Sequence, residues 1–220
     1  MSNFHLISIV GPVGAGKSTI VKELSSRLHE IGLTAFSAGI DCVRKEVWEA
    51  SGRRMWTWED EDDAYAELFH RVTVARETYS VGILETSGLA GRMRHAHRRF
   101  AQFFPLTIVR VDCSVELCLE RNRTRLRNAS EYPVLPFADD LPESIVAMHS
   151  DMRKLRADLI LSSVSDSPEK NAASIIASLH RRAVPSRPPF SLSNASPISY
   201  VEGVRAKARA KRKETAWLPR

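Results

Sequence analysis

A glycine-rich segment near the N-terminus contains the side chains best suited to do chemistry. Residues 11–18 read Gly-Pro-Val-Gly-Ala-Gly-Lys-Ser, which fits the pattern G-x-x-x-x-G-K-[ST], and they follow an apolar run at residues 4–10. Glycines let backbone N–H groups turn toward phosphate oxygens, Lys17 neutralises their charge, and the Ser18 hydroxyl is positioned for Mg²⁺. The segment predicts a site for ATP and Mg²⁺ made by Gly11, Val13, Gly14, Ala15, Gly16, Lys17, Ser18 and Thr19.

A carboxylate and a guanidinium lie three residues apart after the second apolar run, at Asp41 and Arg44. Ligands of α/β sheets bind at the carboxyl ends of the strands, so both side chains are expected at that edge. Asp41 can then accept the proton of an attacking hydroxyl, and Arg44 can hold an anionic group of the substrate. Capping the following helix is a simpler role for Asp41, and it does not exclude catalysis.

Polar side chains also follow the third apolar run, where Glu85, Thr86 and Ser87 stand together. A carboxylate at the end of a buried strand is suited to Mg²⁺ or its waters, so Glu85 is predicted to join Ser18 at the metal and to line the substrate site. Thr86 and Ser87 are predicted to bind phosphate or sugar oxygens of the substrate. The alternative is that these polar groups satisfy the loop backbone.

A basic stretch comes next in the chain. It can be a track for phosphates, in which Arg92 contacts the substrate, or an exposed helix face. Its members are Arg92, Arg94, His95, His97, Arg98 and Arg99.

A second arginine-rich segment carries Arg121 and Arg125, which are one helical turn apart and therefore share a helix face. They are predicted to close on a transferring phosphoryl group and to spread its charge. The proline-rich stretch that follows has no sustained period, so we predict a mobile lid over about residues 121–142. A solvated helix end is the alternative for these arginines.

Short apolar strands alternate with amphipathic helical segments, and this pattern must position the residues above. Strands are predicted at residues 5–10, 34–38, 82–86, 106–112 and 159–162. The alternation predicts an α/β fold, a P-loop NTPase three-layer sandwich in which a five-stranded parallel sheet has helices on both faces and a small lid.

An acidic run at residues 59–63 is predicted to open a helix, because carboxylates favour a helix N-terminus; a metal site is the weaker interpretation. Trp56 and Trp58 lie just before it. They are expected to be packing anchors, with base stacking as a secondary hypothesis.

The charge of the chain is unevenly distributed. The sequence has 220 residues, 43% of them hydrophobic, and a net charge of +6. From residue 181 onward there are ten Lys and Arg against two Glu, so the basic character belongs to the last 40 residues. We expect one folded domain over residues 1–183 and a Pro/Ser-rich linker with a basic tail over residues 184–220. The tail can contact nucleic acid or be merely solvated.

The cellular compartment is predicted from the cysteines and the hydropathy. Cys42, Cys113 and Cys118 form no C-x-x-C pair and leave an odd thiol, which favours a reducing compartment. The N-terminal apolar run is too short for a signal peptide. No apolar stretch of the sequence reaches the roughly 18 residues that a membrane helix needs. A cytoplasmic protein without membrane contact is expected.

Taken together, these motifs resemble the P-loop kinases, and most closely the kinase domain of the polynucleotide 5′-hydroxyl kinases. The similarity extends over roughly residues 5–165 and includes the phosphate loop, the Asp-x-x-Arg of residues 41–44 and the arginine-rich stretch. The sequence departs from the family at Cys42, where a second acidic residue is usual, and at Glu85, where an aspartate is usual.

The resemblance implies a role for each matching residue. It implies that Lys17 and Ser18 hold ATP with Mg²⁺, that Asp41 is the general base, and that Arg44 binds the substrate's phosphate. It also implies that Arg121 and Arg125 stabilise the transition state.

These observations predict an ATP-dependent kinase that transfers the γ-phosphoryl group to a hydroxyl, with a polynucleotide 5′-hydroxyl as the leading acceptor. A kinase of a nucleoside, nucleotide or small metabolite is the first alternative. A nucleotide-gated binding protein with slow ATP hydrolysis is the second. The motifs define the reaction better than they define the acceptor.

Overall fold

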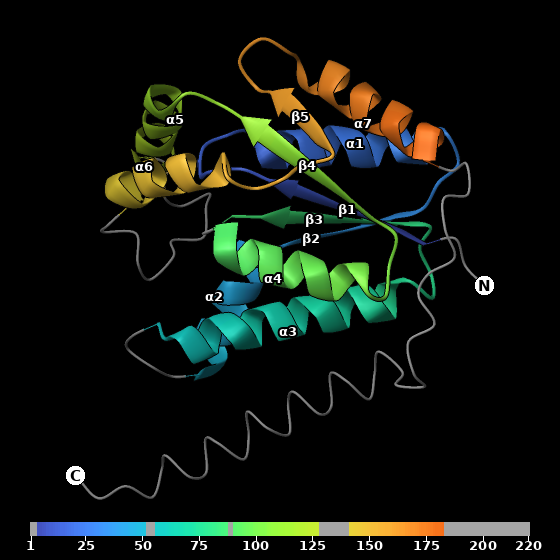
Figure 1. Ribbon diagram of the computed structural model, residues 1–220, viewed down its shortest axis with the longest axis horizontal. Coiled ribbons are helices and arrows are strands. Elements are labelled where there is room, and N and C mark those ends of the chain that lie inside the picture. The colour runs from blue at the N-terminus through green and yellow to red at the C-terminus, as the bar shows by residue number, and fades with distance from the viewer. Residues whose placement is uncertain (1–3, 52–55, 88–89, 128–140, 183–220) are drawn as a thin grey trace, which may run out of the picture.

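Five parallel strands form the centre of the fold in the computed structural model, which describes residues 4–51, 56–87, 90–127 and 141–182 (Figure 1). The strands lie in the order β2-β3-β1-β4-β5, and every neighbouring pair is parallel. Their bounds are β1 His5–Val10, β2 Ala35–Gly39, β3 Val81–Thr86, β4 Leu106–Asp112 and β5 Leu159–Ser162. The predicted strands are therefore confirmed, with shifts of one residue in β2 and at the start of β3.

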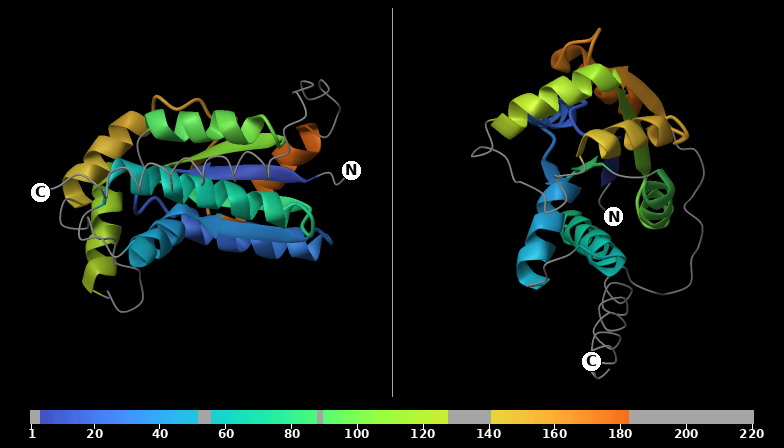
Figure 2. Two further views of the ribbon diagram at one scale, coloured as in Figure 1. Left: turned by 90° about the horizontal axis from the view of Figure 1, so that it is seen from below. Right: turned by 90° about the vertical axis from the view of Figure 1, so that its left-hand side faces the viewer.

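Helices cover both faces of the sheet, as Figures 1 and 2 show. Helices α1 (Lys17–Glu30) and α7 (Pro168–Arg182) pack on one face. Helices α2 (Ile40–Ser51), α3 (Trp58–Ala75) and α4 (Ala90–Ala101) cover the other. The remaining two, α5 (Val115–Arg127) and α6 (Leu141–Met152), lie beyond the end of the sheet toward which the strands point. The predicted three-layer α/β architecture is confirmed.

Strand β1 shows how the alternation of side chains builds two cores. Leu6 joins the apolar cluster beneath α3 and α4, whereas Ile7 and Ile9 join the cluster beneath α1 and α7. All three side chains are fully buried. Side chains of a strand alternate between the two faces, and β1 is central, so both faces of the strand are apolar. This packing holds the loop after β1 rigidly at the centre of the sheet edge.

The acidic run opens α3, as predicted. Thr57 is the N-cap, its hydroxyl accepts from the Asp60 backbone N–H, and the Asp60 carboxylate accepts from the Thr57 backbone N–H in return. This reciprocal pair satisfies two of the donors left free at a helix start. Trp56 packs against Trp48 with ring centroids 6.4 Å apart, which agrees with a packing anchor.

Two predicted segments lie largely or wholly outside the described residues. Most of the lid predicted at 121–142 falls in residues 128–140, and the tail predicted at 184–220 falls in residues 183–220. In the part of the chain that is described, no helix is long and apolar enough to cross a membrane.

Candidate active site

The phosphate loop connects β1 to α1 and depends on two glycines in the left-handed region. Gly14 has φ 83° and Gly16 has φ 88°, a conformation that side chains with a Cβ rarely adopt. A Cβ on Gly14 would lie only 2.6 Å from the carbonyl oxygen of Cys118 in α5. Gly16 is the N-cap of α1 and provides no side-chain cap, so the first N–H groups of the helix are left for an anion.

Lys17 and Ser18 begin α1 directly behind this loop. The Lys17 side chain is buried, and its Nζ donates to the Pro12 carbonyl oxygen at 3.0 Å. The Ser18 hydroxyl donates to Oε1 of Glu85, a residue of β3, at 2.8 Å. The structure therefore brings together the two residues predicted for the metal.

This hydroxyl–carboxylate pair fits Mg²⁺. Mg²⁺ keeps most of its waters and is bound through one or two carboxylates together with substrate phosphates. Among the described residues, no group of three or more His, Cys, Asp or Glu is suited to hold a metal ion. One hydroxyl and one carboxylate, Ser18 and Glu85, beside a phosphate loop agree with that mode of binding.

Asp41 lies in the first turn of α2, at the carboxyl end of β2. Its Oδ1 accepts from Arg44 Nη1 at 2.7 Å, and the Ser87 hydroxyl lies 3.1 Å from Oδ1 and 3.3 Å from Oδ2. The Asp41 side chain is about one third exposed, at 34%. The carboxylate is thus oriented by two partners and still open to an acceptor molecule.

Arg44 is held mainly by a residue that sequence reasoning did not select, Glu61 of α3. Glu61 accepts from Arg44 Nη2 at 2.5 Å and from Nε at 3.0 Å, and both side chains are buried. Burial lowers the pKa of Arg44, but the hydrogen bond and charge of Glu61 outweigh this and raise the pKa above its ordinary value. Glu61 was predicted only as part of a helix start, and no sequence motif links it to Arg44.

The other predicted substrate residues are placed differently. Ser87 joins the Asp41–Arg44 pair, whereas the buried Thr86 points inward and its hydroxyl lies 3.5 Å from that of Ser8. Arg92 of α4 pairs with Asp62 at 3.1 Å and stacks 4.1 Å above the Trp58 ring. Thr86 therefore does not join the group of Asp41, Arg44 and Ser87. The Arg92 side chain forms its ion pair and its ring contact with residues of α3.

The basic stretch on α4 is divided between surface and interior. Arg94, His95 and Arg98 are exposed, but His97 is buried and its Nε2 lies 2.8 Å from the Ser8 hydroxyl. Burial lowers the pKa of His97 to about 4. His97 therefore belongs to the core and takes no part in a surface track.

Arg121 reaches the phosphate loop from α5. Its Nη1 donates to the Gly14 carbonyl oxygen at 3.1 Å and to the Ser163 hydroxyl at 3.3 Å, and its Nη2 donates to the Ser163 carbonyl oxygen at 3.3 Å. Arg125 lies one turn further along α5, with its side chain outside the described residues. Arg121 thus lies beside the loop, and Ser163, which follows β5, is a contact that the sequence did not indicate.

A cavity of about 440 Å³ opens between the phosphate loop, α5 and the segment after β5. Apolar side chains of Ile20, Leu117 and Pro168 form part of its wall, and Asp166 and Asn171 add polar groups. Ligand pockets combine apolar walls with a few polar groups in this way. The cavity adjoins Gly16 and Arg121, so a molecule bound there would be continuous with phosphates on the loop.

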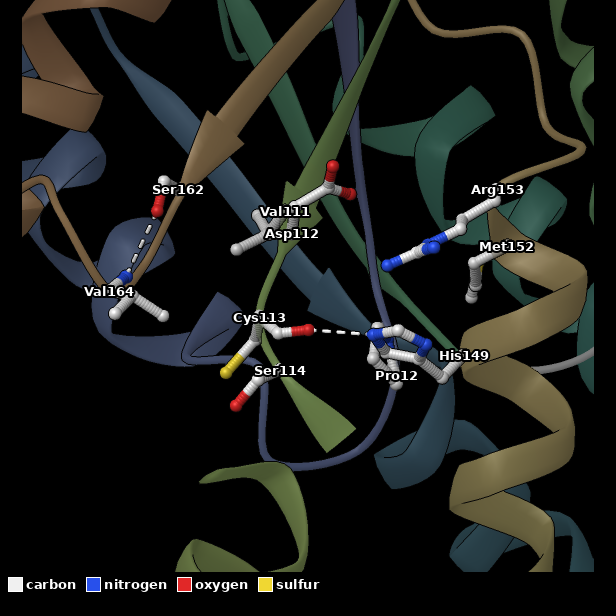
Figure 3. Close-up of a pocket in the computed structure, with 10 residues that line it drawn as sticks. All are labelled: Pro12, Val111, Asp112, Cys113, Ser114, His149, Met152, Arg153, Ser162 and Val164. Carbon is white, nitrogen blue, oxygen red and sulfur yellow. Dashed lines mark hydrogen bonds between the residues drawn. The ribbon is translucent and has the colours of Figure 1, made fainter. Parts of the chain in front are cut away.

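A second cavity, of about 290 Å³, lies between the ends of β4 and β5 and helix α6 (Figure 3). In Figure 3 the His149 ring donates through Nε2 to the Cys113 carbonyl oxygen at 2.8 Å, which ties α6 to the end of β4. Pro12 is the one phosphate-loop residue among the ten that line it. Neither Asp41 nor Glu85 is among the residues that line this cavity.

Comparison with known proteins identifies the family. Residues 6–138, which are more than half of the chain, match the family model described as an AAA domain. This chain belongs to that family. The matched region contains the phosphate loop, the Asp41–Arg44 pair, Glu85 and Arg121, so both the loop and the residues grouped around it fall within the family model.

Solved structures with the same fold include several kinases. Shikimate kinase from Acinetobacter baumannii is 16% identical with a TM-score of 0.57, over 84% of this chain and 97% of that one. APS kinase from Mycobacterium tuberculosis, in complex with AMPPNP and APS, is 19% identical with a TM-score of 0.57, over 80% and 97%. A gluconokinase from Sinorhizobium meliloti 1021 is 16% identical with a TM-score of 0.56, over 81% and 95%.

These comparisons establish the fold. At such low identity the likeness shows a P-loop kinase fold, and it does not carry over the substrates of these proteins. A search of the curated proteins found no match.

Proposed function

We propose that this protein is an ATP-dependent kinase that transfers the γ-phosphoryl group to a hydroxyl of a small metabolite. The observation that carries the proposal is the Asp41 carboxylate, held by Arg44 and Ser87 at the same sheet edge as Lys17 and Ser18. β2, β3 and β1 are neighbours in the sheet, so the loops after them meet at this edge. A donor site and an acceptor-side base adjacent to each other are what a kinase requires.

The donor half would bind ATP. The base and ribose fit the 440 Å³ cavity beside Arg121, and the phosphates fit the loop at the start of α1. When bound at Ser18 and Glu85, Mg²⁺ neutralises charge on the phosphate oxygens. Lys17 and Arg121 supply fixed positive charge to the transferring group, which lowers the barrier by electrostatic stabilisation.

The acceptor half would activate the hydroxyl. Asp41 accepts the proton of the attacking hydroxyl while Arg44 and Ser87 hold the carboxylate in place. General base catalysis of this kind typically contributes about 10²–10⁴-fold to a rate. Kinases of the same fold named for small acceptors, shikimate kinase and gluconokinase among them, support a metabolite as acceptor.

The test is phosphoryl transfer from γ-labelled ATP to a panel of nucleosides, sugars, other metabolites and oligonucleotides, followed by identification of the labelled product. We expect label on a small hydroxyl compound. Label on oligonucleotide 5′ ends would instead establish a polynucleotide kinase. Release of inorganic phosphate with no labelled acceptor would establish a nucleotide-gated binding protein.

Two lysine variants control this assay. Lys17→Ala should remove transfer, since the substitution takes away the buried positive charge at the phosphate loop. Lys22→Ala removes the same charge from an exposed position of the same helix and should leave transfer unchanged. Equal loss in both variants would indicate general damage to α1, and labelling that neither variant reduces would come from a contaminant.

A further inference from the structure

The hydrogen-bonding capacity of Arg44 is fully used within the protein. A guanidinium has five N–H donors. Nε donates to Glu61, Nη1 to Asp41 and to the Ser87 hydroxyl at 3.4 Å, and Nη2 to Glu61 and to the Ser87 carbonyl oxygen at 3.2 Å. Five contacts account for five donors. The Arg44 side chain is only 8% exposed as well, so an incoming anion finds neither a free donor nor an open face.

Two carboxylates offset the single charge of Arg44. Asp41 lies 2.7 Å from it and Glu61 lies 2.5 Å from it, and Glu61 is as deeply buried as the arginine. To release Arg44 toward a substrate phosphate, the buried Glu61 carboxylate would have to lose its partner. Leaving one member of a buried ion pair uncompensated is strongly unfavourable.

The other arginine predicted to contact the substrate is also engaged by an acidic residue of α3. Arg92 pairs with Asp62 at 3.1 Å, although Asp62 is 80% exposed and the pair is correspondingly weak. Residues of one acidic run, Glu61 and Asp62, therefore partner both arginines. This gives the run a role that helix initiation by itself does not explain.

The neighbouring thiol reports a negative environment. Partial burial raises the pKa of Cys42, and the charges of Asp41, Glu85 and Glu46 raise it further, while Arg71 acts in the opposite direction. Cys42 stands next to the base in sequence. A second anion placed at this edge of the sheet would meet the same carboxylates.

We propose that the acceptor is an uncharged hydroxyl compound, such as a polyol or a nucleoside, and that Glu61 sets this preference by occupying Arg44. This inference rests on the proposed kinase function and names its substrate class. A nucleoside 3′-phosphate, or the 5′ end of a polynucleotide, carries a phosphate on the same sugar as its 5′-hydroxyl. Such a phosphate would require the guanidinium that Glu61 holds, so these compounds are poor acceptors.

Matched acceptor pairs test the preference. The value of kcat/KM for label transfer is measured for adenosine and adenosine 3′-monophosphate, and for an uncharged sugar and its monophosphate. The preference is the ratio of kcat/KM for the uncharged member of a pair to that for the phosphorylated member. The wild-type protein should favour the uncharged member by at least about tenfold. Glu61→Gln, which keeps the shape and removes the charge, should reduce this ratio about tenfold through a lower KM for the phosphorylated member.

A control on the same helix separates this effect from a general loss of charge. Glu67 also pairs with an arginine, Arg71, at 3.1 Å, and Glu67→Gln makes the same change of charge outside the site. It should leave the ratio as in the wild type. A wild-type preference for the phosphorylated members would overturn the inference, and so would an unchanged ratio in a folded Glu61→Gln protein.

A binding measurement decides the same point without turnover. With AMPPNP and Mg²⁺ filling the donor side, adenosine 3′-monophosphate is titrated by calorimetry. Wild-type protein should give no saturable binding, Glu61→Gln should gain it, and Glu61→Gln combined with Arg44→Ala should lose it again. Saturable wild-type binding that Arg44→Ala removes would refute the inference. The labelling panel judges kinase function independently, so the two failures are distinguishable.

Discussion

The donor and acceptor halves of the site are built in different ways. The donor half is formed mostly by residues that are adjacent in the sequence. The glycines of the loop, Lys17 and Ser18 lie within one short segment. The acceptor half is a side-chain network in which Asp41 and Arg44 come from α2, Glu61 from α3 and Ser87 from the end of β3. The first half is local in sequence, and the second is assembled only by folding.

This difference has a physical consequence for specificity. A phosphate loop binds through N–H groups and glycine geometry, which tolerate little variation and suit one ligand chemistry. A buried ion network can be rearranged by a single carboxylate on a neighbouring helix. Glu61 illustrates this, because it accepts two of the hydrogen bonds that Arg44 could otherwise offer to a substrate. Related proteins are therefore expected to share the reaction and to differ in the acceptor molecule.

Removing the base should have the largest effect on the acceptor half. Asp41→Asn keeps an oxygen that can accept from Arg44, so the fold should be preserved and kcat should fall about 10²–10⁴-fold. ATP binding, which uses the donor half, should stay near the wild-type value by calorimetry. Full activity in a folded Asp41→Asn protein would exclude Asp41 as the base.

The buried ion pair should dominate the stability of the acceptor half. Glu61→Ala leaves Arg44 buried without its main partner and should reduce the free energy of unfolding in urea by about 3–5 kcal/mol. Asp62→Ala breaks an exposed pair on the same helix and should change it by less than about 1 kcal/mol. Similar losses for the two variants would show that Glu61 acts through the helix and not through Arg44.

Arg121 tests whether the donor half depends on any side chain outside the phosphate loop. Arg121→Ala removes contacts to Gly14 and Ser163 and a charge beside the phosphates, so kcat should fall on the order of 100-fold. Arg123, two residues further along α5, is exposed and serves as the control. Arg123→Ala should stay within about twofold of the wild type in steady-state rate.

The smallest expected effect is the pH dependence of stability that comes from the buried His97. The folded-state pKa of His97 is about 4, below its ordinary value of 6.5, so the unfolded chain binds more protons between these values. Stability should therefore fall as the pH drops through this window, by about 2 kcal/mol between pH 7 and pH 5. His97→Gln should remove that part of the dependence in urea titrations at the two pH values. An unaltered dependence would assign it to other groups.

Local patterns predicted most of the fold. Strands β1, β4 and β5 agree with the predicted bounds, since each is a short apolar run bounded by turn residues. The helix start at the acidic run was also predictable, because capping chemistry is local. Prediction was less complete for side-chain direction at strand ends. Thr86 and Ser87 are adjacent in sequence, yet one faces Ser8 in the interior and the other faces Asp41.

The sequence by itself determined the phosphate loop and the class of the fold, because the loop motif and the alternation of strands and helices depend on residues that are close together in the sequence. Only the tertiary structure decided which residues form hydrogen bonds and ion pairs with Arg44 and Arg121. It brought Glu61 to Arg44 across 17 residues and Ser163 to Arg121 across 42. Contacts of this kind depend on which helices share a face of the sheet and on which charges are buried together. A buried guanidinium needs a carboxylate partner, and the packing of the helices decides which carboxylate lies close enough to pair with it.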